Sequence, residues 1–85
     1  DVREYHEAEI ADLPDYDQLR IPTGEFQGRA AEVAADADVV VYCRGGGRSA
    51  WAAAILMQMG YDRVLNLKGG VLGWRAEVDP SLRAY

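Results

Sequence analysis

The sequence predicts a small α/β domain in which helices cover both faces of a mostly parallel central sheet. One observation is the continuous β-branched run Val39-Val40-Val41, which is typical of a strand in a parallel sheet. Another is the alternation of strand-like and helix-like segments along the chain. Finally, 85 residues suffice for one hydrophobic core only, so residues 1–85 are predicted to form a single domain.

The first half of the chain contains short elements separated by turn residues. Val2 is expected to end a strand whose earlier residues are absent, because the chain starts at Asp1 without a methionine and is expected to have been trimmed or cut from a longer one. The other predicted elements here are a short polar helix at Glu4–Ile10, a Pro/Asp turn at Leu13–Asp17, a strand at Leu19–Ile21 that stops at Pro22, and an amphipathic helix at Gly24–Ala35.

The second half of the chain has stronger signals. A strand at Asp38–Cys43 is expected to be central and buried on both faces, because it is apolar without alternation. The elements predicted after it are a glycine loop at Arg44–Gly47, a helix at Ser49–Met59 that ends at Gly60, a strand at Arg63–Leu67, a turn at Gly69-Gly70, and a helix at Val71–Val78 stopped by Pro80.

Charge and cysteine content exclude several classes of protein. The formal net charge is −5, from 14 acidic and 9 basic residues, which disfavours binding to nucleic acid or to an anionic membrane surface. Cys43 is the only cysteine, so an internal disulfide and a zinc site built on several thiolates are both impossible. We expect no metal and no organic cofactor. A single free thiol suits a reducing compartment, so a cytoplasmic location is expected.

The stretch from Cys43 to Ser49 is the candidate active site. It lies where a strand ends and a helix begins, which is where open α/β sheets bind ligands. Three consecutive glycines allow main-chain N–H groups to turn toward one point, and the helix that follows adds the positive end of its dipole. The candidate residues are the nucleophile Cys43 and the anion-binding loop residues Arg44, Gly45, Gly46, Gly47, Arg48 and Ser49.

The expected effect of this loop is a lowered pKa of the Cys43 thiol. A free thiol with a pKa near ~8.5 is only about 3% ionised at neutral pH. Lowering the pKa to roughly 6.5 requires about 2.7 kcal/mol, whereas a helix terminus typically contributes ~0.3–1 kcal/mol. The main-chain amides are therefore expected to contribute as well, and Arg44 and Arg48 are expected to steer an anionic donor and stabilise charge.

Three motifs together resemble the rhodanese superfamily: the Asp1-Val2-Arg3 opening, the Cys43 loop, and Gly69-Gly70 followed by Trp74. The resemblance covers nearly the whole chain and is nearest to single-domain rhodaneses, including those fused to adenylyltransferases. It implies a sulfurtransferase in which Cys43 becomes a persulfide. The implied donors are thiosulfate or a persulfidated protein, and the implied acceptors are a thiol, cyanide or a sulfur-carrier protein.

Other functions stay open on this scaffold. Rhodanese folds also serve as non-catalytic or regulatory protein-docking modules, although such modules usually lack the nucleophile that is present here. Phosphatases of the same fold place five residues between the cysteine and the anion-binding arginine, whereas four separate Cys43 from Arg48. The shorter loop favours a single sulfur over a tetrahedral phosphate or arsenate. A redox-sensing thiol would lack a resolving cysteine within this chain.

Residues outside the loop are expected to have mainly structural roles. We expect Ser49 to be a helix N-cap, Trp74 to lie in the core, and His6 to be exposed among acids. Asp1 and Arg3, in the opening motif, are expected to form structural hydrogen bonds near the loop. Where many rhodaneses have His-Ile-Pro-Gly, this chain has Asp-Leu-Pro-Asp at residues 12–15, which leaves the turn there without its histidine.

Overall fold

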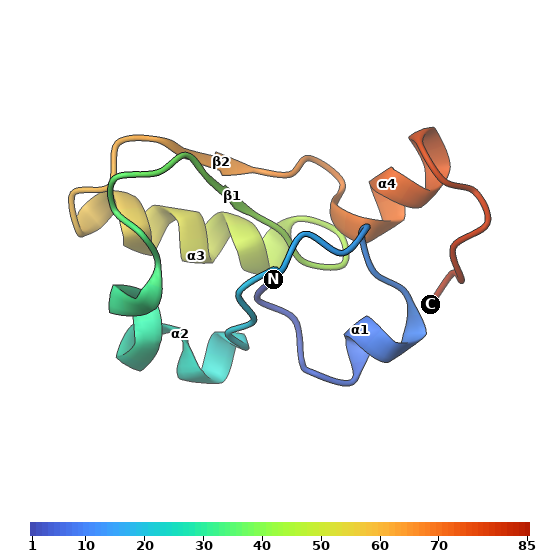
Figure 1. Cartoon of the computed structure of the whole chain (residues 1–85), viewed down its shortest axis with the longest axis horizontal. Helices are drawn as coiled ribbons and strands as arrows, with labels where there is room; N and C mark the ends of the chain where they lie inside the picture. The colour runs from blue at the N-terminus through green and yellow to red at the C-terminus, as the bar shows by residue number, and fades with distance from the viewer.

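A computed structural model describes all of residues 1–85, and at its centre two short parallel strands lie along a long helix (Figure 1). The elements in chain order are α1 (Glu7–Ile10), α2 (Thr23–Arg29), the 3₁₀ helix η1 (Ala30–Glu32), β1 (Val39–Val41), α3 (Gly47–Gln58), β2 (Val64–Asn66) and α4 (Gly70–Glu77). None of these helices is both long and apolar enough to cross a bilayer.

The two strands are parallel neighbours, with Val39 opposite Val64 and Val41 opposite Asn66. Parallel neighbours need a crossover connection, and α3 provides it and packs against both strands. The predicted α/β fold with a parallel sheet is confirmed. Because the strands run the same way, their carboxyl ends meet at one edge of the sheet. The loop after β1 lies at this edge, and so does the end of β2 (Figure 1).

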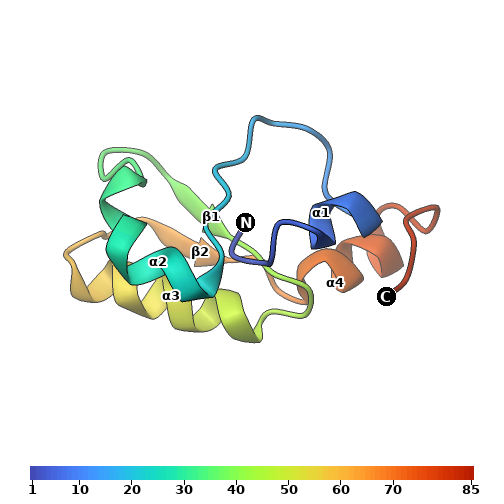
Figure 2. The same ribbon diagram turned by 90° about the horizontal axis from the view of Figure 1, so that it is seen from below.

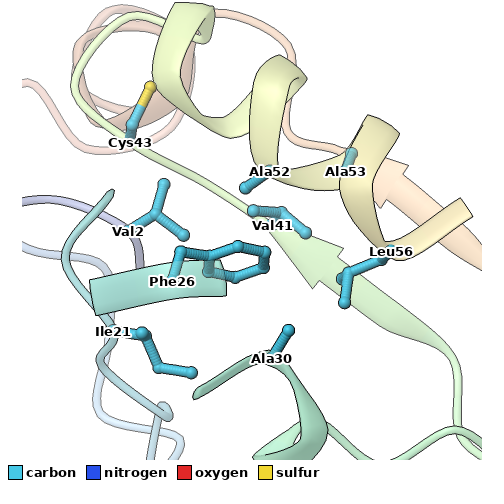
Figure 3. Close-up of a cluster of buried hydrophobic side chains, with 9 residues drawn as sticks. All are labelled: Val2, Ile21, Phe26, Ala30, Val41, Cys43, Ala52, Ala53 and Leu56. Carbon is cyan, nitrogen blue, oxygen red and sulfur yellow. The ribbon is translucent and has the colours of Figure 1, made fainter. Parts of the chain in front are cut away.

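The main core lies between α3, α2 and β1 (Figure 3). It is formed by Val2, Ile21, Phe26, Ala30, Val41, Cys43, Ala52, Ala53 and Leu56. Figure 2 shows α2 lying beside α3, and these two helices are in contact. Tyr42 points to the opposite side of the chain from Val41 and joins a second cluster with Ala11 and with Val71 of α4. Helices therefore pack on both sides of the chain at the carboxyl end of β1.

The expectation that Val39–Tyr42 is buried on both faces was wrong for Val40, which is 54% exposed. The reason is that the sheet has only two strands, and Leu65 beside it is 65% exposed on the same uncovered face. An apolar cavity of about 140 Å³ also lies along β1, lined by Phe26, Val41 and other apolar residues but not by Cys43. This cavity is therefore separate from the candidate site.

Several predicted boundaries were also wrong. Leu19–Ile21 is not a strand, because its two main-chain hydrogen bonds with Asp1, from Asp1 N to the Leu19 oxygen and from Ile21 N to the Asp1 oxygen, do not continue as a ladder. The helix expected at Gly24–Ala35 ends at Arg29 and continues only as η1, since two glycines in the segment lower its helix propensity. The helix after the loop begins at Gly47, two residues before Ser49, so Ser49 is not its N-cap.

The opening segment is held by a network centred on Arg3, which is only 1% exposed. Its guanidinium donates to the carboxylates of Asp1 and Asp12, to the main-chain oxygens of Glu7 and Ala11, and to the Tyr85 hydroxyl. A buried guanidinium needs such partners, because an unpaired buried charge costs several kcal/mol. This is the structural hydrogen bonding expected of the opening motif, and Asp12 takes part in it through Arg3.

Candidate active site

The sulfur of Cys43 faces a ring of hydrogen-bond donors at the start of α3. The main-chain N–H groups of Gly46 and Ser49 point to Sγ at 3.0 and 3.4 Å, and the Ser49 hydroxyl lies 3.4 Å from it. Figure 3 shows the sulfur directed toward the first turn of α3, away from Val2 and Phe26. Although Cys43 is only 1% exposed, its sulfur therefore faces polar groups and not hydrocarbon.

Glycines make this geometry possible. Gly46 has a φ of +111°, a left-handed conformation that few other residues adopt, and it turns its N–H toward the sulfur. Gly45 and Gly47 are exposed, and a Cβ on either would meet nothing within 4 Å. The backbone conformation therefore requires glycine at position 46, whereas Gly45 and Gly47 leave the outer side of the loop open to solvent.

The second glycine pair, Gly69-Gly70, holds the loop from the other side. Both residues have positive φ angles, +77° and +58°, and they begin α4. The first turn of α4 then donates to the loop, from Val71 N–H to the Cys43 carbonyl and from Leu72 N–H to the Arg44 carbonyl, each at 3.0 Å. The N-terminus of α4 thus binds the carbonyl side of the loop, while the N–H side is left to face the sulfur.

These contacts shift the pKa of Cys43. Burial raises it, but hydrogen bonds from the Ser49 hydroxyl and from the amides of Ser49, Gly46 and Gly45 outweigh burial, so the pKa lies below the ordinary value of a thiol. The direction agrees with the expectation from the sequence. The expected cause is confirmed in part, because the main-chain amides contribute together with the Ser49 hydroxyl, whereas neither arginine donates a hydrogen bond to the sulfur.

The lowered pKa leads to a measurable prediction. The rate of Cys43 alkylation by iodoacetamide, measured against pH, should rise with a midpoint below ~8.5, the value for a free cysteine. The sign follows from the direction of the shift, since a lower pKa means that the thiolate persists to a lower pH. A midpoint at or above that of a cysteine-containing reference peptide would contradict the geometry described here.

The two loop arginines are bound elsewhere. Arg48 forms a bidentate ion pair with Glu7 of α1, at 2.6 and 2.9 Å, and this contact lowers the pKa of Glu7 to about 2. Arg44 donates to the main-chain oxygen of Tyr85 and lies 5.1 Å from the centre of its ring. The charge of Arg48 is therefore neutralised at short range, and the hydrogen-bond donors that reach the sulfur are the amides and the Ser49 hydroxyl.

Asn66 is a residue of the site that sequence reasoning missed. It ends β2, and its side chain accepts a hydrogen bond from the Ser49 hydroxyl at 2.5 Å and donates to the Gly46 carbonyl at 3.2 Å. A usable signal was present, because Asn66 interrupts the apolar run Val64–Leu67 of the predicted strand Arg63–Leu67 and falls at the sheet edge that holds the loop. Glu7 was also missed, and nothing in its local sequence distinguishes it from neighbouring acids.

Neither tryptophan of the chain is fully buried. Trp51, in the first turns of α3, is 43% exposed and lines a shallow open depression with Thr23, Gly24, Gly47 and Arg48. Trp74 is only partly buried and belongs to neither core cluster. No three His, Cys, Asp or Glu side chains come together in a way that would hold a metal ion.

A β-strand, a glycine loop around a cysteine sulfur and a helix define an α/β domain whose candidate site is centred on a cysteine. The family model described as "Rhodanese-like domain" matches residues 1–77. The chain belongs to the rhodanese-like domain family.

Known relatives and solved structures agree with this assignment. A protein named "Sulfurtransferase" from Allochromatium vinosum is 51% identical over 67 residues, which are 79% of this chain and 63% of that protein. The chain thus spans less than two thirds of that relative. The crystal structure of a rhodanese-related protein from Thermoplasma volcanium matches with a TM-score of 0.82 and 28% identity, over 91% of this chain and 74% of that one. An NAD-dependent persulfide reductase from A. fulgidus matches with a TM-score of 0.75 and 33% identity, over 86% of this chain and 13% of that one.

Proposed function

We propose that this domain is a sulfurtransferase in which Cys43 carries a sulfane sulfur as a persulfide. The observation that carries the proposal is the ring of donors around Sγ, from Gly46 N–H, Ser49 N–H and the Ser49 hydroxyl. A persulfide anion needs such donors, because charge-assisted hydrogen bonds are the main way to hold an anion away from bulk water. The Allochromatium vinosum relative named as a sulfurtransferase supports the proposal.

The first half of the reaction loads the cysteine. The Cys43 thiolate attacks the outer sulfur of thiosulfate, a bond forms between Sγ and that sulfur, and the sulfur–sulfur bond of thiosulfate breaks. Sulfite leaves with the bonding electron pair, and Cys43 is left as a persulfide anion. A persulfidated protein would load the site in the same way, with a thiolate as the leaving group. The match to a solved persulfide reductase supports persulfide chemistry on this fold.

The second half returns the sulfur to an acceptor. Cyanide, a thiol or a carrier-protein nucleophile attacks the outer sulfur, and the bond to Sγ breaks with its electron pair returning to Cys43. The loop residues Gly45, Gly46, Gly47 and Ser49 hold the anion in both steps. Arg44 contributes positive charge at the loop, whereas Arg48, neutralised by Glu7, fixes α1 against the start of α3. No outside oxidant or reductant is needed, because each step breaks one bond to the transferred sulfur and forms another.

The depression beside the loop suggests how partners approach. It is shallow and open, and the exposed ring of Trp51 lies in it beside Arg48. A surface of this shape suits a protein that docks over the loop better than a metabolite enclosed in a pocket. We therefore propose a protein acceptor, such as a sulfur carrier, in the cell, with cyanide and small thiols as substitutes in the assay.

The experiment that tests the proposal follows sulfur on the intact protein. After incubation with thiosulfate, intact-mass spectrometry should show one added sulfur atom per chain, and later addition of cyanide should remove it and release thiocyanate. Protein alkylated at Cys43 beforehand is the matched control and should gain nothing. An unmodified mass after incubation with both thiosulfate and a small-molecule persulfide would refute the proposal.

The same sample separates the other functions considered for this scaffold. A docking module would take up no sulfur from either donor. A phosphatase would hydrolyse an aryl phosphate, and an arsenate reductase would consume arsenate in the presence of a thiol. We expect neither activity, because the four-residue spacing from Cys43 to Arg48 makes a short loop, and Arg48 is already paired with Glu7.

A further inference from the structure

The hydroxyl proton of Ser49 has three competing acceptors. The Ser49 oxygen lies 3.4 Å from Cys43 Sγ, 3.2 Å from the Gly46 carbonyl oxygen and 2.5 Å from Asn66 Oδ1, which is the nearest of the three. A serine hydroxyl has a single proton, so it can donate to one of these acceptors at a time. Ser49 is fully buried, so its hydroxyl has only these protein acceptors, whereas Asn66 is exposed and its Oδ1 can also accept from water.

The orientation of the Asn66 amide is fixed by its second contact. Its Nδ2 donates to the Gly46 carbonyl at 3.2 Å, and a flipped amide would instead place two acceptors against each other there. Oδ1 therefore faces Ser49 and can only accept. The short distance favours donation from Ser49 to Asn66 while Cys43 is a neutral thiol, and in that state the Ser49 oxygen is free to accept the S–H.

Ionisation of Cys43 changes the balance. A sulfur anion is a stronger acceptor than a neutral thiol, because its hydrogen bonds are charge-assisted. For the Ser49 hydroxyl to stabilise the anion, its proton has to turn from Asn66 to Sγ, and the short contact from Ser49 to Asn66 Oδ1 is then lost. The stabilisation that Ser49 gives to the anion is therefore reduced by the contact that it breaks.

We propose that Asn66 is a positioning residue for Cys43, which sets through the Ser49 proton how strongly the sulfur anion is stabilised. Its effect is exerted on the thiol itself, so it goes beyond sulfur transfer and does not depend on which donor or acceptor is used. The hydrogen bond from Ser49 to Asn66 keeps a larger fraction of Cys43 in the neutral thiol form, and loss of this hydrogen bond favours the thiolate.

Other charged groups near the sulfur come from three elements and are not altered by a neutral change at Asn66. They are Arg48 of α3, Glu7 of α1, which pairs with Arg48, and the α-amino group of Asp1, in the segment before α1. The amide donors from Gly46 and Ser49 are main-chain groups. An effect of Asn66→Leu on Cys43 is therefore expected to pass through the Ser49 hydroxyl.

The test measures the pKa of Cys43 from the pH dependence of alkylation in four proteins: wild type, Asn66→Leu, Ser49→Ala and the double variant. Leucine has nearly the shape of asparagine but accepts nothing, so Asn66→Leu should lower the pKa by about half a unit and raise the alkylation rate about three-fold at a pH below the midpoint. In the Ser49→Ala background the same change should have no effect. A higher or unchanged pKa in Asn66→Leu, or an equal shift without Ser49, would overturn the proposal.

A second variant decides the matter if Asn66→Leu does not fold. Asn66→Asp keeps the shape and offers a stronger acceptor, so it should raise the pKa of Cys43, and the rise should be smaller in the Ser49→Ala background. A role limited to bracing the loop predicts instead that both replacements raise the pKa, and by the same amount with and without Ser49. Because alkylation does not involve sulfur uptake, failure here is distinguishable from failure of the proposed sulfurtransferase activity.

Discussion

Replacing Gly70 by alanine should destabilise the domain by on the order of 3 kcal/mol and should remove most of the reactivity of Cys43. The φ of Gly70 is +58°, which is strained for alanine. A Cβ at this position would also lie 2.4 Å from the Cys43 carbonyl oxygen and 2.6 Å from that of Arg44. Both contacts are with main chain, so no side chain can rotate away, and α4 has to move off the loop.

That movement breaks the two hydrogen bonds by which α4 holds the loop, from Val71 to Cys43 and from Leu72 to Arg44. Each such bond contributes about 1 kcal/mol, and the positive φ adds a similar cost. Since a domain has a total stability of about 5–15 kcal/mol, a loss of this size is a large fraction of it. The measurement is urea unfolding, combined with the alkylation rate of Cys43 at neutral pH.

Gly60 provides the matched control. It too has a positive φ, of +99°, but a Cβ there meets nothing within 4 Å. Gly60→Ala therefore introduces backbone strain without the clash, and we expect a loss of about 1 kcal/mol with unchanged alkylation of Cys43. If Gly70→Ala lowered the free energy of unfolding no more than Gly60→Ala, the close packing of α4 against the loop would not be needed to stabilise the domain.

The parts of the fold that were predictable from the sequence are those set by neighbours along the chain. The β-branched run of β1 predicts a strand, and the glycines after Cys43 predict a loop whose N–H groups face the sulfur. Both predictions depend little on the rest of the molecule. The helix α3 was also expected, because an alanine-rich segment with Leu and Met favours a helix in any context. Its start was misplaced by two residues, because Gly47 was assigned to the loop, and its end by one residue.

What was not predictable depends on residues that are far apart in the sequence. Arg48 was expected to act on an anionic donor, but its partner Glu7 lies 41 residues away on a helix of four residues. No periodicity links the two. The exposure of Val40 likewise depends on the number of strands in the sheet and on what covers it, and the apolar run of β1 says nothing about either.

Asn66 illustrates an intermediate case. Its polarity within an apolar strand was visible, and parallel strands end at a common edge, so its proximity to the loop could have been inferred. Its contact with Ser49 could not have been inferred, because that contact depends on where α3 starts. Since α3 starts at Gly47, the Ser49 side chain turns inward. The assignment of Ser49 as an N-cap failed for the same reason.

Replacing Cys43 by serine should abolish sulfur transfer while leaving the domain folded. Under the proposed function, the outer sulfur has no other place to bind, because the chain has no second cysteine. A serine hydroxyl is not ionised near neutral pH and is a poor nucleophile without a general base. The rate of thiocyanate formation from thiosulfate and cyanide should therefore fall by at least about 10³-fold, to the uncatalysed background.

The fold should survive this change, because a serine Oγ can still accept hydrogen bonds from Gly46 and Ser49. Cys43 contributes to the apolar cluster, so the substitution should cost about 1–2 kcal/mol in urea unfolding. Ser49→Ala is the matched control, because it removes one donor from the ring and keeps the nucleophile. It should still take up one sulfur atom, at a lower rate, so that a loss of loading confined to Cys43→Ser assigns the sulfur to Cys43. Thiocyanate release at the wild-type rate by Cys43→Ser would show that the sulfur is carried elsewhere, and the donor ring would then need another explanation.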